Sequence, residues 1–410
     1  MVTSKEFPYL RPVWKRATCD TIEPTMNPAK ARRHVKMVCT LGPASNFAET
    51  IEKMLKGGMN IARLNLAHGT LEEHARFISE IRALSQKLEL PTGILLDLPG
   101  LKKRAGDIRS VFKDHLEFAH SQKVDFIALS FISSARQVRE VKSLLSSMNA
   151  SLPVIAKIEQ ARALERSGPI IEISDGIMVA RGDLALEISI EKVPLAQKHL
   201  IREANRRGKP VITATQMLES MVRSTQPTRA EATDVANAIL DGTDALMLSE
   251  ETTIGRYPVE ATEMMSRIAL EAESAFPYAE MLRDRWLDIL PEVDDATAGA
   301  ACQIARQVEA RAIIAFTTGG STALRLSKYR PQQPVLAVTP SERCTRRLSL
   351  VWGVLPVVEP EPAILEEVFE LTRKVALETG VARRGDLVVV TAGLPLRVPG
   401  STNLLKVHSV

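Results

Sequence analysis

The stretch VKMVCTLGPASNFAETIEKMLKGGMNIARLN, residues 35–65, contains the repeating unit that decides the fold. Two β-rich apolar runs, Val35–Thr40 and Asn60–Asn65, flank the amphipathic stretch Phe47–Lys56. Six similar runs follow: Gly93–Asp97, Asp125–Phe131, Pro153–Glu159, Gly176–Ala180, Pro210–Thr215 and Ala245–Ser249. Apolar strands that alternate with helical stretches predict a parallel sheet buried on both faces. Eight such units in succession favour a closed (β/α)8 barrel, the TIM barrel, over an open sheet.

The rest of the chain lies on either side of this barrel, which we expect over residues 34–272. Residues 1–33 have no clear periodicity, and we interpret them as an N-terminal extension. Strand-like and helical runs return later, so residues 273–410 are predicted to form a smaller α/β layer domain. Its candidate elements are the strands Ala312–Phe316, Val335–Thr339 and Leu387–Thr391 and the helix Ala363–Thr379.

Composition argues against several classes of function. A net charge of +4 over 410 residues, with no dense basic stripe, argues against nucleic-acid binding. The cysteines are isolated, without a CxxC pair, which is typical of a reducing cytosol rather than of a disulfide framework or a zinc site. No apolar run reaches membrane-spanning length, and the polar start Met1–Lys5 is not a secretory signal. We therefore expect a cytoplasmic protein that binds neither membranes nor nucleic acid.

Polar residues gather where the predicted strands end, which is where TIM barrels carry their active sites. A single polar residue there would be only a strand-end cap. A ring with two arginines, a lysine, three carboxylates and a threonine is costly to assemble without a ligand. The residues of this ring are Arg63, Asn65, Asp97, Ser130, Lys157, Glu159, Arg181, Gly182, Asp183 and Thr215.

This inventory matches the needs of phosphoryl transfer. Lys157 and Glu159 are two apart on one strand and point to the same face. A lysine beside a metal-bound carboxylate stabilises charge on a transferring phosphoryl group, and Glu159 and Asp183 are suitable oxygen ligands for Mg²⁺. The ARGD stretch, Ala180–Asp183, is able to start a short helix whose N–H groups hold a carboxylate. The alternative is that Lys157 and Glu159 form a simple ion pair on the sheet.

Several longer motifs resemble the pyruvate kinase family, in the family's order and with its spacing. They are VCTLGPAS (38–45), IARLNLAHG (61–69), VIAKIE (154–159), SDGIMVARGDLALEI (174–188), VITATQMLESM (211–221), PTRAEATDVANAILDGTDALMLSEET (227–252) and GRYPVEA (255–261). The resemblance extends from Val35 to TNLLKV (402–407). It implies a glycolytic enzyme that transfers a phosphoryl group from phosphoenolpyruvate to ADP, giving pyruvate and ATP. It also implies Mg²⁺ or Mn²⁺ as cofactor and a homotetramer as assembly.

The resemblance assigns roles to residues in the matched motifs. Lys157 corresponds to the lysine that stabilises the transferring group, and Glu159 and Asp183 correspond to the divalent-metal ligands. Thr215 corresponds to a threonine of the proton-delivery network near the enolate carbon. The substrate-binding set comprises the backbone of Ala180, Arg181, Gly182 and Asp183, with Thr215 and Ser130. The arginines that face the substrate phosphate are Arg63 and Arg104, and the monovalent-cation ligands are Asn65 and Asp97.

Three positions or segments depart from the family's usual pattern. Ala67, Leu98 and Lys102 replace residues of the potassium-using version, and the ammonium of Lys102 is a candidate substitute for K⁺, so K⁺ is not expected to be required. SEET (249–252) replaces the more usual SGET. The third departure is the largest. The family inserts a lid domain between strand three and the following helix, and this sequence has no segment of that size there.

In this sequence only a short connection joins Asp97 to the predicted helix Val111–Ser121. We therefore predict a fold without an inserted β-barrel lid domain, the deletion lying near residues 101–108. A natural loss, an engineered loss and a sequence from which a mobile lid was omitted are all compatible with this connection. A rival to the enzyme is accordingly a lid-less protein that binds phosphoenolpyruvate and metal with little or no turnover.

The predicted C-terminal domain contains a candidate effector site. TTGGSTA (317–323) follows a strand and opens a helix, so its N–H groups and hydroxyls are suited to a phosphate. The alternative is an ordinary helix cap. By position in the resemblance, Thr317, Thr318, Gly320, Ser321 and Thr322 are the candidate ligands of a phosphorylated effector.

Overall fold

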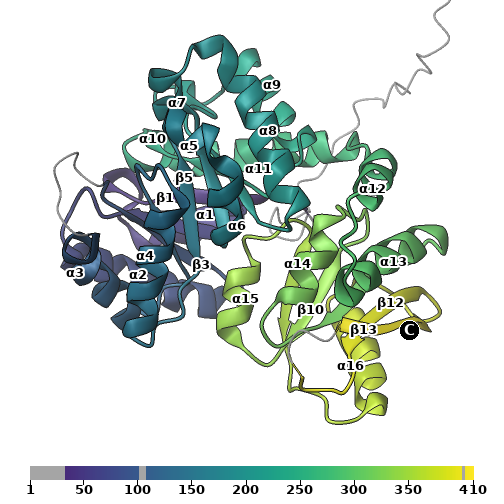
Figure 1. The fold of residues 1–410 in the computed structure, drawn as a ribbon. Coiled ribbons are helices and arrows are strands. Elements are labelled where there is room, and N and C mark those ends of the chain that lie inside the picture. Colours follow the sequence, from purple (N-terminus) through teal and green to yellow (C-terminus); the bar gives the residue numbers. More distant parts are fainter. Residues whose placement is uncertain (1–32, 101–107, 399–401) are drawn as a thin grey trace, which may run out of the picture.

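A closed eight-stranded parallel barrel forms the first part of the chain (Figure 1). The computed structural model describes residues 33–100, 108–398 and 402–410. Each strand pairs with its neighbours in the sequence, and β8 closes the barrel on β1 through partners such as Val38 and Met247. The barrel strands are β1 Lys36–Thr40, β2 Ile61–Asn65, β3 Gly93–Leu98, β4 Phe126–Leu129, β5 Val154–Ile158, β6 Gly176–Ala180, β7 Val211–Ala214 and β8 Ala245–Leu248.

Helices surround the barrel and connect successive strands. Their ends follow sequence signals: Thr70 caps α2 by accepting a hydrogen bond from the Glu73 N–H, and Gly58 ends α1 with a φ of 113°. The helices of this part are α1 Ala48–Gly57, α2 Leu71–Leu88, α3 Ile108–Ser121, α4 Ala135–Ser147, α5 Ala161–Glu165, α6 Ser167–Ile173, α7 Arg181–Glu187, α8 Val193–Arg206, α9 Arg229–Leu240, α10 Glu250–Thr253 and α11 Pro258–Ser274, with short 3-10 helices η2 Pro43–Ser45, η3 Ile190–Lys192 and η4 Glu219–Val222.

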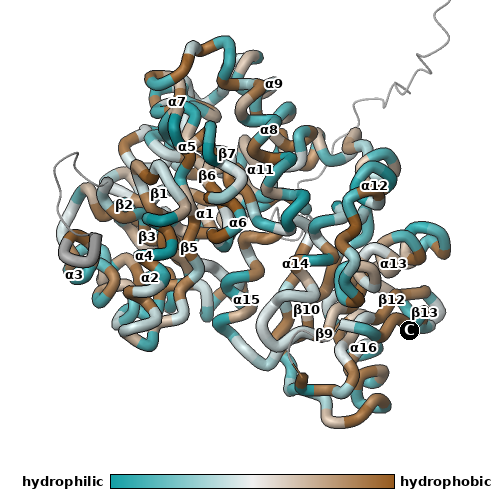
Figure 2. Tube along the Cα trace, viewed as in Figure 1, coloured by the Kyte–Doolittle hydropathy of each residue, from teal (hydrophilic) through white to brown (hydrophobic). Residues whose placement is uncertain are grey.

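Alternate residues of each strand supply two hydrophobic layers. On β1, Val38 belongs to the cluster inside the barrel, whereas Met37 and Cys39 pack outward against the helices. Both faces of the strands are therefore buried, as the nearly continuous apolar runs predict. Figure 2 shows the contrast between these hydrophobic segments and a peripheral helix, α12 (Tyr278–Trp286), where hydrophilic residues are frequent.

A second, five-stranded sheet with the order β11-β10-β9-β12-β13 forms the C-terminal domain. Ile313 and Ala315 face one hydrophobic cluster with α13 and α14, and Ile314 and Phe316 face another with α16. The strands are β9 Ile313–Phe316, β10 Val335–Thr339, β11 Val354–Val358, β12 Leu387–Gly393 and β13 Thr402–Ser409, and β13 alone pairs antiparallel. The helices are α12 Tyr278–Trp286, α13 Val293–Gln307, α14 Ser321–Lys328, α15 Glu342–Leu348 and α16 Leu365–Glu378.

Polar contacts join the C-terminal domain to the amino ends of the barrel strands. Arg330 is fully buried there and donates to Asp244 at 2.7 Å, just before β8. Arg346 of α15 donates to Asp125 at 3.0 Å, just before β4, and α15 lies beside the barrel in Figure 1. Leu350 belongs to the hydrophobic cluster inside the barrel. We call the opposite end of the barrel, where the strands terminate, its open end.

The predicted fold class is confirmed, with two differences at the level of elements. All eight barrel strands lie where the sequence predicts them, with ends shifted by a residue or two, because periodicity does not define hydrogen-bonded ends. The sequence analysis missed β11 and β13, whose exposed edge positions weaken the apolar pattern. The strands of the described residues form only the barrel and the five-stranded sheet. The proposed deletion lies at residues 101–107, outside the described residues, as does most of the N-terminal extension.

Candidate functional site

A cluster of buried charges occupies the open end of the barrel. Lys157, at the end of β5, lies 2.7 Å from Glu159 and 3.2 Å from Asp97, and its Nζ donates to Ser130 Oγ at 2.9 Å. Arg63 of β2 donates to the same Asp97 oxygen through Nε at 2.9 Å and Nη2 at 2.7 Å. Four neighbouring strand ends thus bring together five of the residues that the sequence singled out.

Burial makes these charges unusually dependent on one another. Lys157 is 8% exposed, and Glu159 and Asp97 are each 1% exposed. Burial by itself lowers the pKa of Lys157, but attraction to Asp97 and Glu159 outweighs this and raises it above the ordinary value. Burial raises the pKa of Asp97, yet Arg63 and Lys157 bring the net pKa below its usual range. The cluster therefore keeps Lys157 charged although its side chain is buried.

Glu159 differs from Asp97 in having only part of its charge compensated. Burial raises its pKa, and the nearby Lys157 and the Phe131 N–H, which donates at 2.7 Å, offset this only in part. A further cation next to Glu159 would stabilise its ionised form. The carboxylate is thus suited to a metal ion.

Asp183 is a second carboxylate suited to the same ion. It lies in the first turn of α7, directly after β6, and β6 pairs with β5. No hydrogen bond or ion pair of its carboxylate occurs among the described residues, which leaves both oxygens available. Among the described residues, no group of three or more His, Cys, Asp or Glu side chains is placed to hold a metal ion. Two carboxylates on adjacent strand ends fit Mg²⁺, which keeps several waters and takes other ligands from bound phosphates.

The junction after β7 is held in a strained conformation. Thr215 and Gln216 have φ angles of 68° and 55°, and a positive φ is unusual for a β-branched residue. Thr215 Oγ1 donates to the Ala214 carbonyl at 2.6 Å and accepts from the Gly182 N–H at 2.8 Å. The threonine hydroxyl is therefore fixed against the start of α7.

The Arg181 side chain reinforces this junction. Its guanidinium donates to the carbonyls of Thr215 at 2.8 Å and Gln216 at 3.3 Å, and it pairs with Asp234 of α9 at 2.7 Å. The predicted short helix at ARGD is confirmed as α7. The side chain of Arg181 is thus engaged in supporting the Thr215 turn.

Sequence reasoning missed several residues of this region. Thr40 Oγ1 accepts from Arg63 Nη1 at 2.9 Å, and Asp234 is the acidic partner of Arg181. Glu251 is buried and accepts from the Leu218 and Ser249 N–H groups at 3.0 and 2.7 Å, bridging the turns after β7 and β8. Thr40, Asp234 and Glu251 lie within the motifs that resemble the family, and this was the only sign in the sequence that they contribute to the site. Their roles could not be predicted, because their hydrogen-bond partners are distant in sequence.

The predicted monovalent-cation site is only partly described. Asp97 is already engaged by Arg63, Lys157 and Ser130, whose Oγ donates to Asp97 Oδ1 at 3.0 Å. Asn65 Oδ1 accepts from the Ala67 N–H at 3.2 Å. Lys102 and Arg104 lie outside the described residues, so their predicted roles stay predictions.

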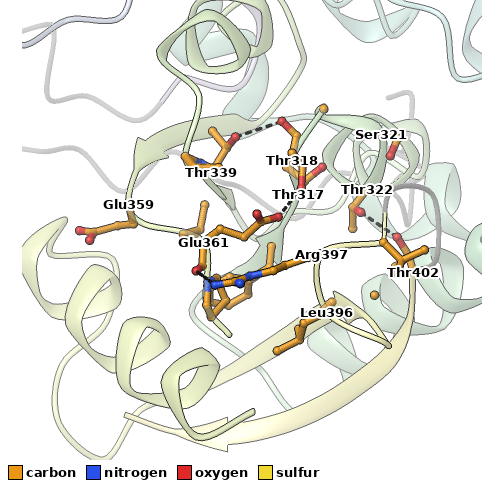
Figure 3. A pocket seen from close by; sticks show the side chains of 18 of the residues that line it. Thr317, Thr318, Ser321, Thr322, Thr339, Glu359, Glu361, Leu396, Arg397 and Thr402 are labelled. Carbon is orange, nitrogen blue, oxygen red and sulfur yellow. Dashed lines mark hydrogen bonds between the residues drawn. The ribbon is translucent and has the colours of Figure 1, made fainter. Parts of the chain in front are cut away.

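The Thr317–Thr322 loop lines a cavity of about 140 Å³ in the C-terminal domain (Figure 3). The loop follows β9 and opens α14 with Gly320 at a φ of 93°. The Thr317 hydroxyl accepts from the Gly320 N–H at 2.9 Å, and Thr322 is hydrogen-bonded to Thr402 at 2.7 Å. Arg397, which the sequence analysis did not identify, reaches the cavity beside Glu361. Glu361 in turn accepts from Thr318 at 2.8 Å.

No helix among the described residues has the length and apolarity that a membrane span requires.

Comparison with known proteins gives matches along most of the chain. A family model described as "Pyruvate kinase, barrel domain" matches residues 32–113 and 110–262, and "Pyruvate kinase, alpha/beta domain" matches residues 295–408. Pyruvate kinases of Staphylococcus aureus strains USA300 and NCTC 8325 are each 37% identical over 471 aligned positions, covering 92% of this chain and 80% of the relative.

The alignment is longer than the 410-residue chain itself, so these relatives have residues inside the aligned region that this chain lacks. The barrel model also matches in two segments that meet at residues 110–113, next to the short connection between β3 and α3. On the evidence of both family models and these relatives, the chain belongs to the pyruvate kinase family of phosphotransferases.

Proposed function

We propose that this chain transfers a phosphoryl group from phosphoenolpyruvate to ADP, forming pyruvate and ATP. The observation that carries the proposal is the position of Lys157, which is buried, kept charged by Asp97 and Glu159, and directed to the open end of the barrel. A fixed ammonium group at this place stabilises negative charge on a phosphoryl group during transfer. Membership of the family supports the choice of substrates.

In this proposal Lys157 and Arg63 contact the phosphoryl oxygens, and the start of α7 holds the substrate carboxylate. The Gly182 N–H now donates to Thr215 Oγ1, so a bound carboxylate would share or replace this hydrogen bond. Substrate binding would thereby act directly on the Thr215 hydroxyl. A divalent ion held by Glu159 and Asp183 supplies neutralising charge for the phosphate when it is bound.

After phosphoryl transfer the remaining enolate requires a proton at its carbon. The Thr215 hydroxyl, fixed between the Ala214 carbonyl and Gly182, is the group we assign to the delivery network. The strained turn and its Arg181 support keep this hydroxyl in one position. A neutral hydroxyl relays a proton from water rather than supplying one of its own, so a chain of water molecules completes the path.

We also propose that K⁺ is not required. Asp97, the residue that matches a K⁺ ligand, already contacts two cationic side chains, Arg63 and Lys157. Ala67 provides no side-chain oxygen, and Lys102 carries a fixed charge of the same sign as the ion. Two positive groups on one buried carboxylate leave little attraction for a third.

A second candidate function is binding of phosphoenolpyruvate and metal with little or no turnover. The short connection between Leu98 and Ile108 favours it, because no lid domain can close over the nucleotide and exclude water. A coupled assay of ADP-dependent pyruvate formation by the 410-residue chain separates the two candidates. Turnover at a rate normal for a kinase supports the enzyme. Metal-dependent binding of phosphoenolpyruvate without turnover supports the binder.

For the C-terminal cavity we propose a phosphorylated effector, bound by Thr317, Thr318, Gly320, Ser321 and Thr322. The hydroxyls, the N–H groups at the start of α14 and Arg397 suit a phosphate. Ser321→Glu should weaken sugar-phosphate or nucleoside-monophosphate binding through like-charge repulsion. Unchanged affinity in that variant would leave the loop as an ordinary helix cap.

We further propose a domain division at about residue 273 and a homotetrameric assembly. The division is supported by the end of α11 at Ser274, after which the second group of elements follows. The assembly is supported by exposed apolar side chains near α7, since Leu186, Ile190 and Leu195 are 87%, 76% and 70% exposed. Sedimentation analysis of the wild type and Ile190→Asp tests the second proposal, which requires smaller particles from the variant.

A further inference from the structure

A cavity of about 350 Å³ lies between the amino end of the barrel and the C-terminal domain, remote from the open end of the barrel. The barrel contributes the loop after α8, including Lys209, and the C-terminal domain contributes α14 and α15. Figure 1 shows α14 and α15 on the side of the C-terminal sheet that faces the barrel. Any molecule bound in the cavity therefore contacts both domains.

Most of the charged side chains around this cavity are already paired. Arg207 pairs with Glu203 at 2.5 Å, and Arg325 pairs with Asp294 at 2.5 Å. Lys328 pairs with the buried Asp295 at 2.8 Å. The charge of each of these three cations is balanced by a carboxylate.

The acids of the lining are likewise occupied or exposed. Asp175 pairs with Lys142 at 2.9 Å and accepts from the Val154 N–H at 2.8 Å. Asp295 is held by Lys328, and Glu292 is exposed to solvent. Asp175 attracts the two remaining cations of the lining, Lys209 and Arg347, at longer range, but no ion pair joins either of them to a carboxylate among the described residues.

These two cations, Lys209 and Arg347, differ from the others. Within the described part of the chain, Lys209 Nζ makes no hydrogen bond or ion pair, although partial burial lowers its pKa. Arg347 donates through Nη2 to the Ser151 carbonyl, but its Nε is buried without a partner. Arg343 shares the same carbonyl, so two guanidinium groups converge on one neutral acceptor. Desolvated cations without a counterion are costly unless a ligand compensates them.

The remaining wall of the cavity is apolar. Leu290, Leu324 and Leu348 line it together with Val351. A compact inorganic ion would leave this wall unused, whereas an aliphatic body would cover it.

We propose that this cavity binds a small organic anion whose carboxylate or phosphate lies between Lys209 and Arg347 and whose apolar body packs on the leucines. The site is remote from the phosphoryl-transfer site. It shares Gly319 and Ser321 with the lining of the Thr317–Thr322 cavity, but neither Lys209 nor Arg347 lines that cavity. Because it is made by both domains, its ligand holds them together and favours one relative placement. The inference does not depend on turnover, so it stands or falls independently of the catalytic proposal.

Calorimetric titration with butyl phosphate and with inorganic phosphate, at constant ionic strength, tests the site. Butyl phosphate should bind the wild type more tightly than inorganic phosphate because of its apolar chain. Lys209→Met should weaken butyl phosphate binding about tenfold or more, the scale of a lost charge-assisted hydrogen bond. Lys209→Arg should retain binding within about threefold, since it keeps the charge. Lys192→Met, which removes an exposed lysine of η3, is the matched control and should bind as the wild type does.

Two further measurements distinguish loss of the site from misfolding of the variant and from binding in another cavity. Without ligand, Lys209→Met should melt at or above the wild-type temperature, because it removes an uncompensated charge. Arg397→Ala, which alters only the other cavity, should leave butyl phosphate binding unchanged. The proposal is overturned by absence of millimolar binding to the wild type, by equal affinity in Lys209→Met, by lower thermal stability of that variant, or by loss of binding in Arg397→Ala.

Discussion

The two ends of the barrel contain buried cations in opposite electrostatic situations. At the open end, Lys157 lies between two carboxylates, Asp97 and Glu159, and its pKa is raised. At the end that faces the C-terminal domain, Lys36 is 4% exposed, and its one hydrogen-bond acceptor among the described residues is the Val354 carbonyl at 2.8 Å. Burial lowers its pKa to about 7. The comparison teaches that burial alone does not decide the charge state of a lysine; the counterions do.

The end that faces the C-terminal domain also has a buried cation with a close carboxylate partner. Arg330 contacts Asp244 at 2.7 Å, Asn205 at 2.6 Å and the Gly242 carbonyl at 2.8 Å, and it lies over the Trp352 ring. Within the part of the chain that the structure describes, neither Lys36 nor Lys209 has a carboxylate partner of this kind. Replacing Arg330, which has a carboxylate partner, should lower the stability of the protein. Replacing Lys36 or Lys209, which have none, should change stability less or raise it.

Removing Arg330 should produce the largest effect. Arg330→Met leaves Asp244 buried beside Trp352 without its cation, and breaking a buried pair costs about 3–5 kcal/mol of the free energy of unfolding. Denaturant unfolding of both proteins measures this loss. Arg202→Met, an exposed arginine of α8, is the control and should change stability little. A loss below about 1 kcal/mol for Arg330→Met would mean that the network does not join the domains.

At the open end, Lys157→Met should abolish function more than it alters folding. Phosphoryl transfer should fall at least ~10²-fold, the scale for deleting one preorganised charge. The coupled assay for pyruvate gives the rate, and circular dichroism with thermal melting tests the fold. Phosphoenolpyruvate binding should largely persist, because Arg63 and the start of α7 remain. Near-wild-type turnover would show that Lys157 and Glu159 form only a structural ion pair.

The pH dependence of stability sharpens the contrast between the two ends. Lys36 has a folded-state pKa of about 7, below its unfolded value of 10.5, so between these values the unfolded chain binds more protons. Stability attributable to this group should therefore rise with pH from 7 towards 10. The groups around it are Arg33, which lowers its pKa, and Glu273 and Asp244, which raise it.

The measurement is the unfolding free energy of the wild type minus that of Lys36→Met, taken at several pH values. This difference should increase by up to about 1 kcal/mol per pH unit above pH 7. The same comparison for Lys53→Met, an exposed lysine of α1, should be flat over pH 7–9. A difference that falls as pH rises would contradict the burial of a lysine whose pKa is lowered.

The smallest effect is expected from exchanging the monovalent cation. Activity or metal-dependent substrate binding should persist when Na⁺ or a bulky organic cation replaces K⁺, because Asp97 already has Arg63 and Lys157. Lys102→Glu should introduce a modest dependence on K⁺, limited by the ligand that Ala67 does not provide. Titration of the wild type with KCl against NaCl at equal ionic strength is the test. Strong activation of the unmodified chain by K⁺ would contradict the prediction.

By itself, the sequence determined the barrel and the place of its chemistry. Strands buried on both faces require apolar residues at nearly every position, so runs such as Gly176–Ala180 can be recognised as strands in the sequence. In a closed parallel barrel all carboxyl ends meet at one rim, so polar residues that follow these runs must gather there. Lys157, Glu159 and Asp97 could therefore be predicted as neighbours without coordinates.

Only the tertiary structure decided how these charges are paired and what lies between the domains. The sequence does not indicate that Arg63 and Lys157 share Asp97, because the pairing depends on strand register. It gives no sign that Arg181 supports Thr215 across 34 positions. That Lys209 and Arg347 form no ion pair among the described residues is equally invisible, because side chains from different domains acquire counterions, or lack them, only when packing brings the domains together.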